Sequence, residues 1–165
     1  MLNIREGQPS DLAEITRFDQ QLMVFDQTFD PTLNLSWPLS QGGQEFYKAR
    51  LSRAEGIAWI AEDEGRMVGY LLGCLNQSAE YSRPEVTAEI ECLYVDPSRR
   101  GEGIGGRLIE RFEAWAQAAG ARRLRVTVSA ANRSALRFYR RRGFRCFDVV
   151  LDKPISGEGS RADGG

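Results

Sequence analysis

The chain of 165 residues contains no histidine. This absence excludes a Ser-His-Asp or Cys-His catalytic pair, a His-ligated zinc or haem, and an imidazole that acts as general base. Acid–base chemistry must therefore come from carboxyl, phenol, amine or thiol side chains, or from water. Lysine is scarce too, because all but Lys48 and Lys153 of the 22 basic residues are arginines, whose guanidinium groups suit phosphate contact.

Long apolar runs are also missing. No run approaches the ~20 residues that cross a bilayer, and the first residues lack the charged and apolar regions of a signal peptide. The cysteines Cys74, Cys92 and Cys146 show neither close pairing nor metal-ligand spacing. Because each lies in an apolar run, we expect buried thiols in a reducing compartment. The chain is therefore expected to be cytoplasmic, without a metal site or a membrane partner.

The composition that remains is that of an ordinary globular domain, with 42% hydrophobic and 27% charged residues. We expect one domain over residues 1–153 and a flexible tail over 154–165, which is rich in Gly, Ser and Asp. The net charge of −1 hides a separation. Residues 1–98 hold 7 basic and 16 acidic side chains, whereas residues 99–165 hold 15 basic and 7 acidic ones. This favours a basic half that binds an anion and an acidic half that binds a cation. Alternatively, the uneven distribution of charge is a drift in the sequence that creates no electrostatic field of consequence.

Hydrophobic periodicity predicts alternating strands and helices. Strands are expected at 2–6, 57–62, 67–75, 86–95, 124–128 and 144–151, and helices at 10–25, 44–55, 107–119 and 133–142. The hairpin signal at 63–66 predicts antiparallel strands, and the later strand–helix–strand crossover predicts a parallel pair. The expected fold class is α/β, with a central mixed, mostly antiparallel sheet of six to seven strands and about four helices on both faces.

The strongest local signal is the stretch from Asp96 to Gly106, DPSRRGEGIGG, between a strand and a helix. Its glycines and the helix start can direct backbone N–H groups to one point, which suits a pyrophosphate, and Arg99 and Arg100 add charge. The Walker pattern G-x-x-x-x-G-K-[ST] is absent. The dinucleotide pattern G-x-G-x-x-G is present, but the next strand ends without an Asp or Glu for a ribose hydroxyl. A nicotinamide-dependent oxidoreductase is therefore a distant alternative.

Residues 88–151 resemble the GNAT superfamily of acetyl-CoA-dependent N-acetyltransferases. AEIECLYVDPSRRGEGIGGRLI is similar to its acetyl-CoA strand and pyrophosphate loop, and NRSALRFYRRRGF is similar to its second motif. The resemblance implies a GNAT-like fold and an acyltransferase that uses acetyl-CoA as cosubstrate. It also implies that the backbone of Leu93, Tyr94 and Val95 pairs with the pantetheine arm. The residues implied to hold the pyrophosphate are Arg100, Gly101, Glu102, Gly103, Ile104, Gly105 and Gly106.

The acid and the base of acetyl transfer have different candidates. Asn132 precedes a helix as a cap, and the resemblance adds a pantetheine contact; a cap alone is the alternative. Tyr139 lies two helical turns beyond Asn132 on the same face, and the resemblance gives its phenol contact with the cofactor and the role of proton donor to the leaving thiolate. Glu89 and Glu91 are expected to share a strand face with Leu93 and Val95. Glu89 matches the catalytic Glu of some family members, and Glu91 is the second candidate for the general base. Alternatively, both are solvated carboxylates that only attract a cation.

The resemblance also implies that the first two helices and the loop before the second strand shape the acceptor site. Acidic and aromatic side chains gather there: Asp19, Phe25, Asp26, Phe29, Asp30, Trp37, Glu45, Phe46 and Tyr47. They suit a cationic small-molecule or peptide amine, attacked directly in a ternary complex as the resemblance implies. The arginine-rich stretch 137–145 lacks a nucleic-acid module, so no nucleic-acid partner is expected. A non-catalytic acyl-CoA sensor on the same fold is the alternative, and a homodimer stays open because dimers are common in the superfamily.

Overall fold

A computed structural model of the chain describes residues 1–77, 85–153 and 155. Its sheet has the strand order β1-β2-β3-β4-β5. The strands are β1 (Asn3–Glu6), β2 (Ile57–Asp63), β3 (Arg66–Gln77), β4 (Val86–Val95) and β5 (Arg123–Val126). The first four pair antiparallel and β5 runs parallel to β4, which confirms the predicted mixed sheet, the hairpin and the parallel crossover.

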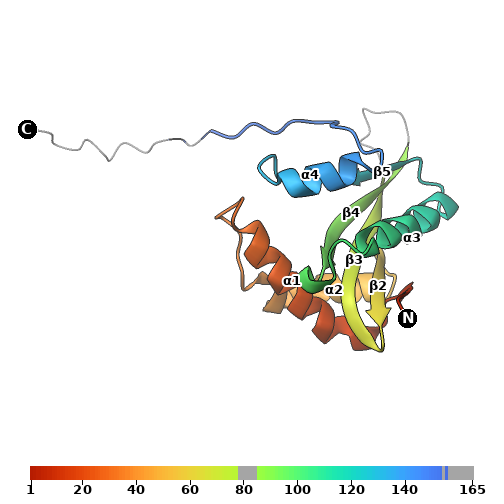
Figure 1. Cartoon of the computed structure of the whole chain (residues 1–165). Coiled ribbons are helices and arrows are strands. Elements are labelled where there is room, and N and C mark those ends of the chain that lie inside the picture. Colours follow the sequence, from red (N-terminus) through yellow and green to blue (C-terminus); the bar gives the residue numbers. More distant parts are fainter. Residues whose placement is uncertain (78–84, 154, 156–165) are drawn as a thin grey trace, which may run out of the picture.

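Helices cover both faces of this sheet (Figure 1). They are α1 (Leu12–Asp26), α2 (Gln41–Leu51), α3 (Ile104–Ala118) and α4 (Arg133–Arg140), with short 3₁₀ turns at Pro9–Asp11, Trp37–Leu39 and Pro97–Arg99. On one face, α1 and α2 bury Phe18 and Tyr47 against Tyr70 of β3. On the other, α3 buries Leu108 and Phe112, which recur at helical spacing, in a cluster that also holds Tyr139 of α4.

A β-bulge in β4 changes which side chains face which layer. Leu72 of β3 lies opposite Cys92, but Gly73 lies opposite Ile90, so Glu91 is an extra residue on β4. Before the bulge, Ala88 and Ile90 pack in the α3 cluster; after it, Cys92 and Tyr94 pack toward α1 and α2, while Leu93 and Val95 join the α3 cluster. The prediction that Glu89 shares a face with Leu93 and Val95 is therefore wrong, because the bulge interrupts the alternation that it assumed.

The strands β4 and β5 stay paired for only four residues. Thr87–Ile90 pairs with Arg123–Val126, and beyond Ile90 the sheet register contains no partner for β4 on this side within the described residues. The two strands thus separate just where the bulge begins. This leaves one backbone edge of the last part of β4 open toward the region between the two strands.

The predicted last strand at 144–151 does not form. The described residues hold five strands rather than six to seven, and the chain after α4 runs out from the body (Figure 1). This segment touches β5 through Phe147, because the guanidinium groups of Arg123 and Arg125 lie over the Phe147 ring. Strand-forming composition alone is not enough, because a strand needs hydrogen-bonded neighbours, and no strand among the described residues pairs with this segment.

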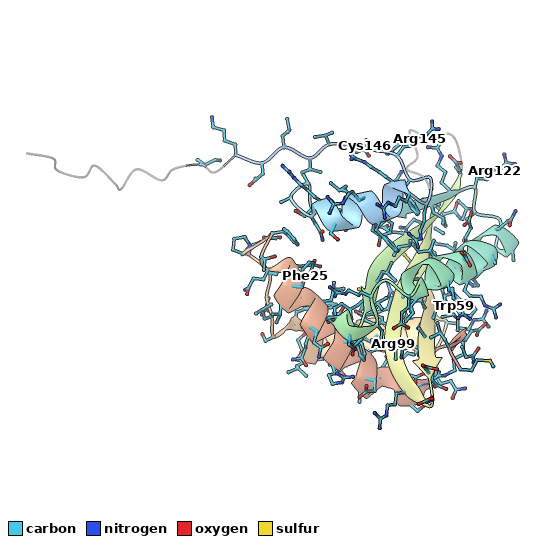
Figure 2. All side chains as sticks on the ribbon, in the orientation of Figure 1. Phe25, Trp59, Arg99, Arg122, Arg145 and Cys146 are labelled. Carbon is cyan, nitrogen blue, oxygen red and sulfur yellow. The ribbon has the colours of Figure 1, made fainter. Side chains whose placement is uncertain are left out.

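The cysteines divide accordingly. Cys74 is buried, as expected, whereas Cys92 is only half-buried and Cys146 is exposed on the segment after α4 (Figure 2). The prediction of a buried Cys146 is wrong because it assumed a packed last strand. The proposed tail at 154–165 lies outside the described residues, apart from Ile155.

The described residues hold neither a membrane-spanning helix nor a cluster of metal-ligating side chains. No helix among them combines the length and apolarity needed to cross a membrane. No group of three or more His, Cys, Asp or Glu side chains in the same residues could hold a metal ion.

Candidate active site

A cavity of about 270 Å³ lies where β4 and β5 separate. Its walls come from α1 and the loop after it, from both strand ends and the chain after β5, and from the beginning and end of α4. The lining residues are Leu22, Asp26, Phe29, Asp30, Leu33, Ile90, Glu91, Cys92, Leu93, Val126, Thr127, Val128, Ser129, Asn132, Ala135 and Tyr139. The cavity therefore joins the expected acceptor region to the second motif.

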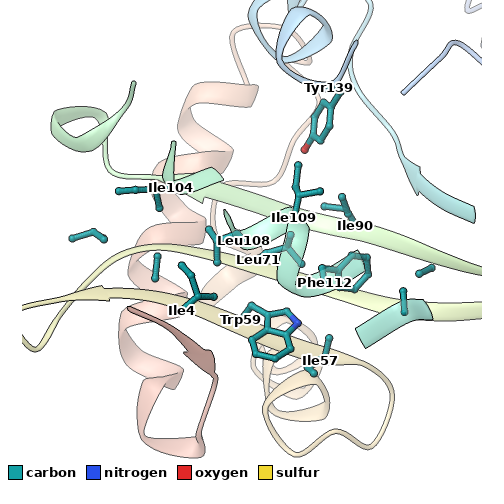
Figure 3. Close-up of a cluster of buried hydrophobic side chains, with 14 residues drawn as sticks. Ile4, Ile57, Trp59, Leu71, Ile90, Ile104, Leu108, Ile109, Phe112 and Tyr139 are labelled. Carbon is teal, nitrogen blue, oxygen red and sulfur yellow. The ribbon is translucent and has the colours of Figure 1, made fainter. Parts of the chain in front are cut away.

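Tyr139 reaches this cavity from α4. Its ring packs edge-on against Phe138 and Phe144, and its hydroxyl oxygen points from the helix toward the sheet (Figure 3). Burial is the main cause that raises the pKa of Tyr139 above its ordinary value, and the nearby Cys92 and Asp26 add to it. The phenol is thus protonated throughout the neutral range and is chemically able to give a proton to a thiolate.

Asn132 also lines the cavity, and it is the N-cap of α4. Its side-chain oxygen accepts a hydrogen bond of 3.0 Å from the backbone N–H of Ala135, as predicted for a cap. The residue is buried. The cap fixes the start of α4 and so the direction in which Tyr139, two turns later, enters the cavity.

The glycine-rich loop ends in an uncapped helix start. Gly103 has φ +80° in the left-handed region, and its neighbours Ile104, Gly105 and Gly106 form the first turn of α3. No side chain of the described residues caps this turn, so its N–H groups are open donors beside the positive helix end. These features fit a pyrophosphate, as the motif predicts.

The two arginines of this loop have different partners. Arg99 binds Glu102 and Asp63 in ion pairs of 2.9 and 3.0 Å, so its charge is largely offset within the chain. Arg100 donates a hydrogen bond of 3.0 Å to the carbonyl oxygen of Val95. Its guanidinium lies 5.3 Å from the centre of the Tyr94 ring and 5.8 Å from that of the Phe25 ring. Figure 2 shows Phe25 at the end of α1. Arg100 is therefore the loop cation without a carboxylate partner in the described residues.

The side chains of the predicted pantetheine strand are occupied by packing. Leu93 and Val95 pack against the α3 cluster, and Tyr94 is buried toward α1, where its hydroxyl donates to Gln21. On one side their backbones pair with β3, and on the other they lie beyond the end of the β5 pairing. The open backbone edge fits the predicted role, which needs no side chain.

The two glutamates that were predicted as candidates for the general base lie in different surroundings. Glu91 lines the cavity, and Arg50 of α2 donates to both of its oxygens, at 2.9 and 2.6 Å. Glu89 is not among the lining residues, and its carboxylate accepts a hydrogen bond of 2.6 Å from the side-chain amide of Asn76. The bulge thus separates two carboxylates that simple alternation brings together.

A buried carboxylate lies next to Cys92, one of the residues that line the cavity. Asp19 of α1 accepts hydrogen bonds of 2.5 Å from both Tyr47 and Tyr70, and all three side chains are buried.

Tyr70 and Arg50 are structural partners that the sequence did not indicate, since neither belongs to a motif. Burial and the neighbouring Asp19 carboxylate raise the pKa of the Cys92 thiol well above its ordinary value, so this cavity cysteine is a poor nucleophile.

A larger hollow of about 700 Å³ lies elsewhere, between the end of α2, β3 and the end of α3. None of the predicted catalytic or cofactor residues lines it. Its position at the far end of α3 from the glycine-rich loop separates it from the cavity described above.

Comparison with known proteins decides the family. The family model described as "Acetyltransferase (GNAT) family" matches residues 22–144, which include both motifs and most of the cavity wall. The chain belongs to the GNAT acetyltransferases. This GNAT protein is accordingly an acetyl-CoA-dependent acetyltransferase. Membership of the family is consistent with the uncapped first turn of α3 and the open backbone edge of β4.

Relatives of this acetyltransferase occur in bacteria, archaea and animals. An uncharacterized N-acetyltransferase of Bacillus subtilis is 31% identical over 87% of the chain and 89% of its own length. One of Methanocaldococcus jannaschii is 34% identical over 64% of the chain, but only 46% of its own length is covered, so the chain spans about half of that relative. A protein of Bos taurus named thialysine N-epsilon-acetyltransferase is 28% identical over 85% of the chain and 82% of its own length.

Solved structures share the fold. A mutant protein from Bacillus halodurans superposes with a TM-score of 0.80 at 24% identity, over 93% of this chain and 99% of that one. An aminoglycoside N-acetyltransferase in complex with CoA gives a TM-score of 0.70 at 18% identity, over 94% and 95% of the two chains. At these identities the likeness extends to the fold alone.

Proposed function

We propose that this GNAT acetyltransferase moves the acetyl group of acetyl-CoA to a primary amine of a small cationic molecule or peptide, by direct attack in a ternary complex. The observation that carries the proposal is the cavity between β4 and β5. Its acceptor side holds the carboxylates Asp26, Asp30 and Glu91, and its other side holds Tyr139. Acidic side chains there favour a cationic acceptor over an anionic one.

The cofactor would bind along the wall that the two family motifs form. Open N–H groups at the start of α3 would hold the pyrophosphate, with Arg100 beside them, and the open edge at Leu93–Val95 would hold the pantetheine arm. A Cβ on Gly105 would lie only 3.0 Å from the Phe138 ring, so the loop and α4 meet closely there. The thioester brought to this wall would face Tyr139.

Within this site each residue has a proposed step. Backbone N–H groups of β4 would stabilise the oxyanion of the thioester carbonyl, and Tyr139 would protonate the departing thiolate. Asn132 would orient α4 and touch the pantetheine. A carboxylate would accept the proton of the acceptor ammonium, and Glu89 and Glu91 remain the candidates that the sequence indicates.

Amines named for relatives support the acceptor class. The bovine relative is named for thialysine, and the enzyme in the CoA complex is named for aminoglycosides. Both acceptors carry primary amines that are protonated at neutral pH. The proposal carries this class, rather than either molecule, to the present chain.

A panel of acceptors tests the proposal. Purified protein and acetyl-CoA would be mixed with thialysine, 1,4-diaminobutane, neamine and a lysine-containing peptide, and with carboxylic and neutral acceptors, while thiol release is followed. Release above the rate without acceptor is expected for amines only. A preference for an anionic acceptor would contradict the cationic class, and tight acetyl-CoA binding without release on any amine would favour the acyl-CoA sensor.

We also propose a homodimer, which the resemblance left open. Large apolar side chains are exposed along the segment after α4, among them Val149, Val150 and Leu151. Exposed apolar side chains gathered in one extended segment are typical of a contact surface.

A cytoplasmic location stays a prediction from the sequence.

A further inference from the structure

Five carboxyl groups lie at or near the cavity, and they differ in what already binds them. Glu91 is held at both oxygens by Arg50, and Glu89 is held by Asn76 away from the cavity lining. Both carboxylates are therefore already occupied by partners within the chain, and Glu89 does not face the cavity at all.

The carboxylates of α1 and its following loop complete the comparison. Asp19 accepts hydrogen bonds from two buried tyrosines, and Asp30 accepts one of 2.6 Å from the hydroxyl of Thr32 and one of 3.0 Å from its backbone N–H. Asp26 is half-buried and lines the cavity. In the part of the chain that the structure describes, its carboxylate has no hydrogen-bond donor and no cation as partner.

We propose that Asp26 is the general base of this acetyltransferase, which takes the proton from the ammonium group of the acceptor. The inference rests on the proposed function, since it needs an amine acceptor in the cavity. Asp26 stands on the α1 wall, and Tyr139 stands on the α4 wall of the same cavity. The acceptor nitrogen would therefore meet a base on one side and the thioester on the other.

The proton transfers balance in this arrangement. The ammonium gives one proton to the Asp26 carboxylate, and the lone pair of the neutral nitrogen then forms a bond to the thioester carbonyl carbon. The C–S bond breaks with its electron pair on sulfur, and the thiolate takes the proton of the Tyr139 hydroxyl. The positively charged amide nitrogen returns a proton to the phenolate, and Asp26 passes its own proton to water. The products are the acetylated amine, free coenzyme A and one proton.

The surroundings of Asp26 suit a base. Burial, and after it the Asp19 carboxylate, raises the pKa of Asp26 above its ordinary value, which brings it nearer to the operating pH. An unpaired, partly desolvated carboxylate also attracts an ammonium group strongly. The other titratable groups around the cavity are Asp19 and Asp30 on the α1 side, Glu91 and Cys92 on β4, and Tyr139 on α4.

The test compares Asp26→Asn with wild type on the amine of the panel that wild type acetylates fastest. We expect kcat at pH 7 to fall by about 100-fold or more, with the KM for the amine changed much less. The rise of the wild-type rate with pH that reports the base should be lost in the variant. Asp26→Glu keeps a carboxylate and should recover part of the rate. Glu14→Gln, an exposed change on the same helix, is the control for both rate and fold.

Binding and folding are measured separately. Acetyl-CoA affinity of Asp26→Asn should match wild type, since the side chain lies on the acceptor wall. Its urea midpoint at pH 7 should equal or exceed that of wild type, because burial and Asp19 disfavour the charged carboxylate that the substitution removes. A higher KM with unchanged kcat would overturn the base in favour of an ammonium anchor. A wild-type pH profile in Asp26→Asn would overturn it too, as would loss of that profile in Glu89→Gln or Glu91→Gln alone. If wild type acetylates no amine at all, the proposed function fails first, and the inference about Asp26 falls with it.

Discussion

Gly103 is the residue on which the cofactor loop depends, because its φ of +80° precedes the open first turn of α3. A valine there would have to adopt a left-handed backbone, which costs about 1–2 kcal/mol, and would place a branched side chain in the anion cradle. We expect Gly103→Val to weaken acetyl-CoA binding at least tenfold, as isothermal titration calorimetry would show.

Gly120 supplies a matched control for this prediction. It also has a positive φ, +85°, and lies just beyond the opposite end of α3, and a Cβ at either glycine would meet open space. Gly120→Val should lose a similar free energy of unfolding while it keeps the wild-type affinity for acetyl-CoA. Equal losses of affinity in both variants would show that strain, and not the cradle, is responsible.

Tyr139→Phe separates the phenol from its ring. The ring contacts with Phe138 and Phe144 remain, so the free energy of unfolding should change little. Loss of the proton donor should lower kcat by about 100-fold, whereas the KM for acetyl-CoA should stay close to wild type. Steady-state thiol release gives both constants. A variant with unchanged kcat would remove Tyr139 from the acid role.

The same phenol sets an expectation for alkaline pH. Because burial raises the pKa of Tyr139, its proton is lost only above its ordinary value of 10.0. The protonated form is present below that value and is lost as pH rises through the raised pKa. The wild-type kcat should therefore show no decline from this group below about pH 10. A decline that begins near pH 8 and disappears in Tyr139→Phe would contradict this expectation.

At the scale of elements, one ion pair joins α2 to the bulge of β4. The side chains of Arg50 and Glu91 are 10% and 18% exposed, and they bind through two contacts. Removing one partner leaves a largely buried charge without its counter-ion, which costs about 3–5 kcal/mol when burial is complete. We expect Arg50→Met to destabilise the fold by about 2 kcal/mol, and Arg50→Met with Glu91→Gln to recover part of that loss.

Urea unfolding of the two single variants and the double variant measures this coupling. A loss in the double variant equal to the sum of the single losses would show that the two side chains act independently. It would then follow that packing, rather than the ion pair, holds α2 against the bulged strand.

How much could be predicted depends on the range of the interactions. The order of elements as far as α4, the hairpin and the cap at Asn132 follow from local patterns, and the structure has these three features. Glu91 shows the first limit: a bulge is defined by the register with the neighbouring strand, so alternation within one strand could not reveal it.

Two other departures have similar causes. Helix α3 begins at Ile104, three residues before its predicted start, because Gly105 and Gly106 are helical despite their low intrinsic propensity. The pair allows the helix to approach Phe138 and Arg142, which a Cβ would meet at 3.0 and 2.5 Å. The segment 144–151 has a strand composition, but whether it pairs depends on a neighbour that its own sequence does not specify.

At the scale of the whole molecule, the separation of charge along the chain is only partly visible at the cavity. The acidic half contributes the carboxylates Asp26 and Asp30 to its lining, whereas the residues that the basic half contributes are uncharged, and Arg100 lies on the loop before α3, outside the lining. Much of the formal charge is offset locally, as in Arg99 with Glu102. We therefore expect the acceptor and the cofactor to be selected by the few charges without an oppositely charged partner in the described residues, such as Asp26 and Arg100, rather than by the net charge of each half.

The proposed homodimer belongs to this scale as well. Val150 and Leu151 are each 90% exposed, and no strand of the described residues covers the outer edge of β5 nearby. Light scattering should give twice the 18.5 kDa of one chain for wild type, and a single-chain mass for Val150→Asp with Leu151→Asp. Leu39→Asp, at another exposed leucine, should leave the dimer intact. Because these side chains touch little within one chain, the paired change should alter the unfolding free energy of a monomer by only about 0.5 kcal/mol. A wild-type monomer, or a dimer that both aspartates leave intact, would contradict an interface at this segment.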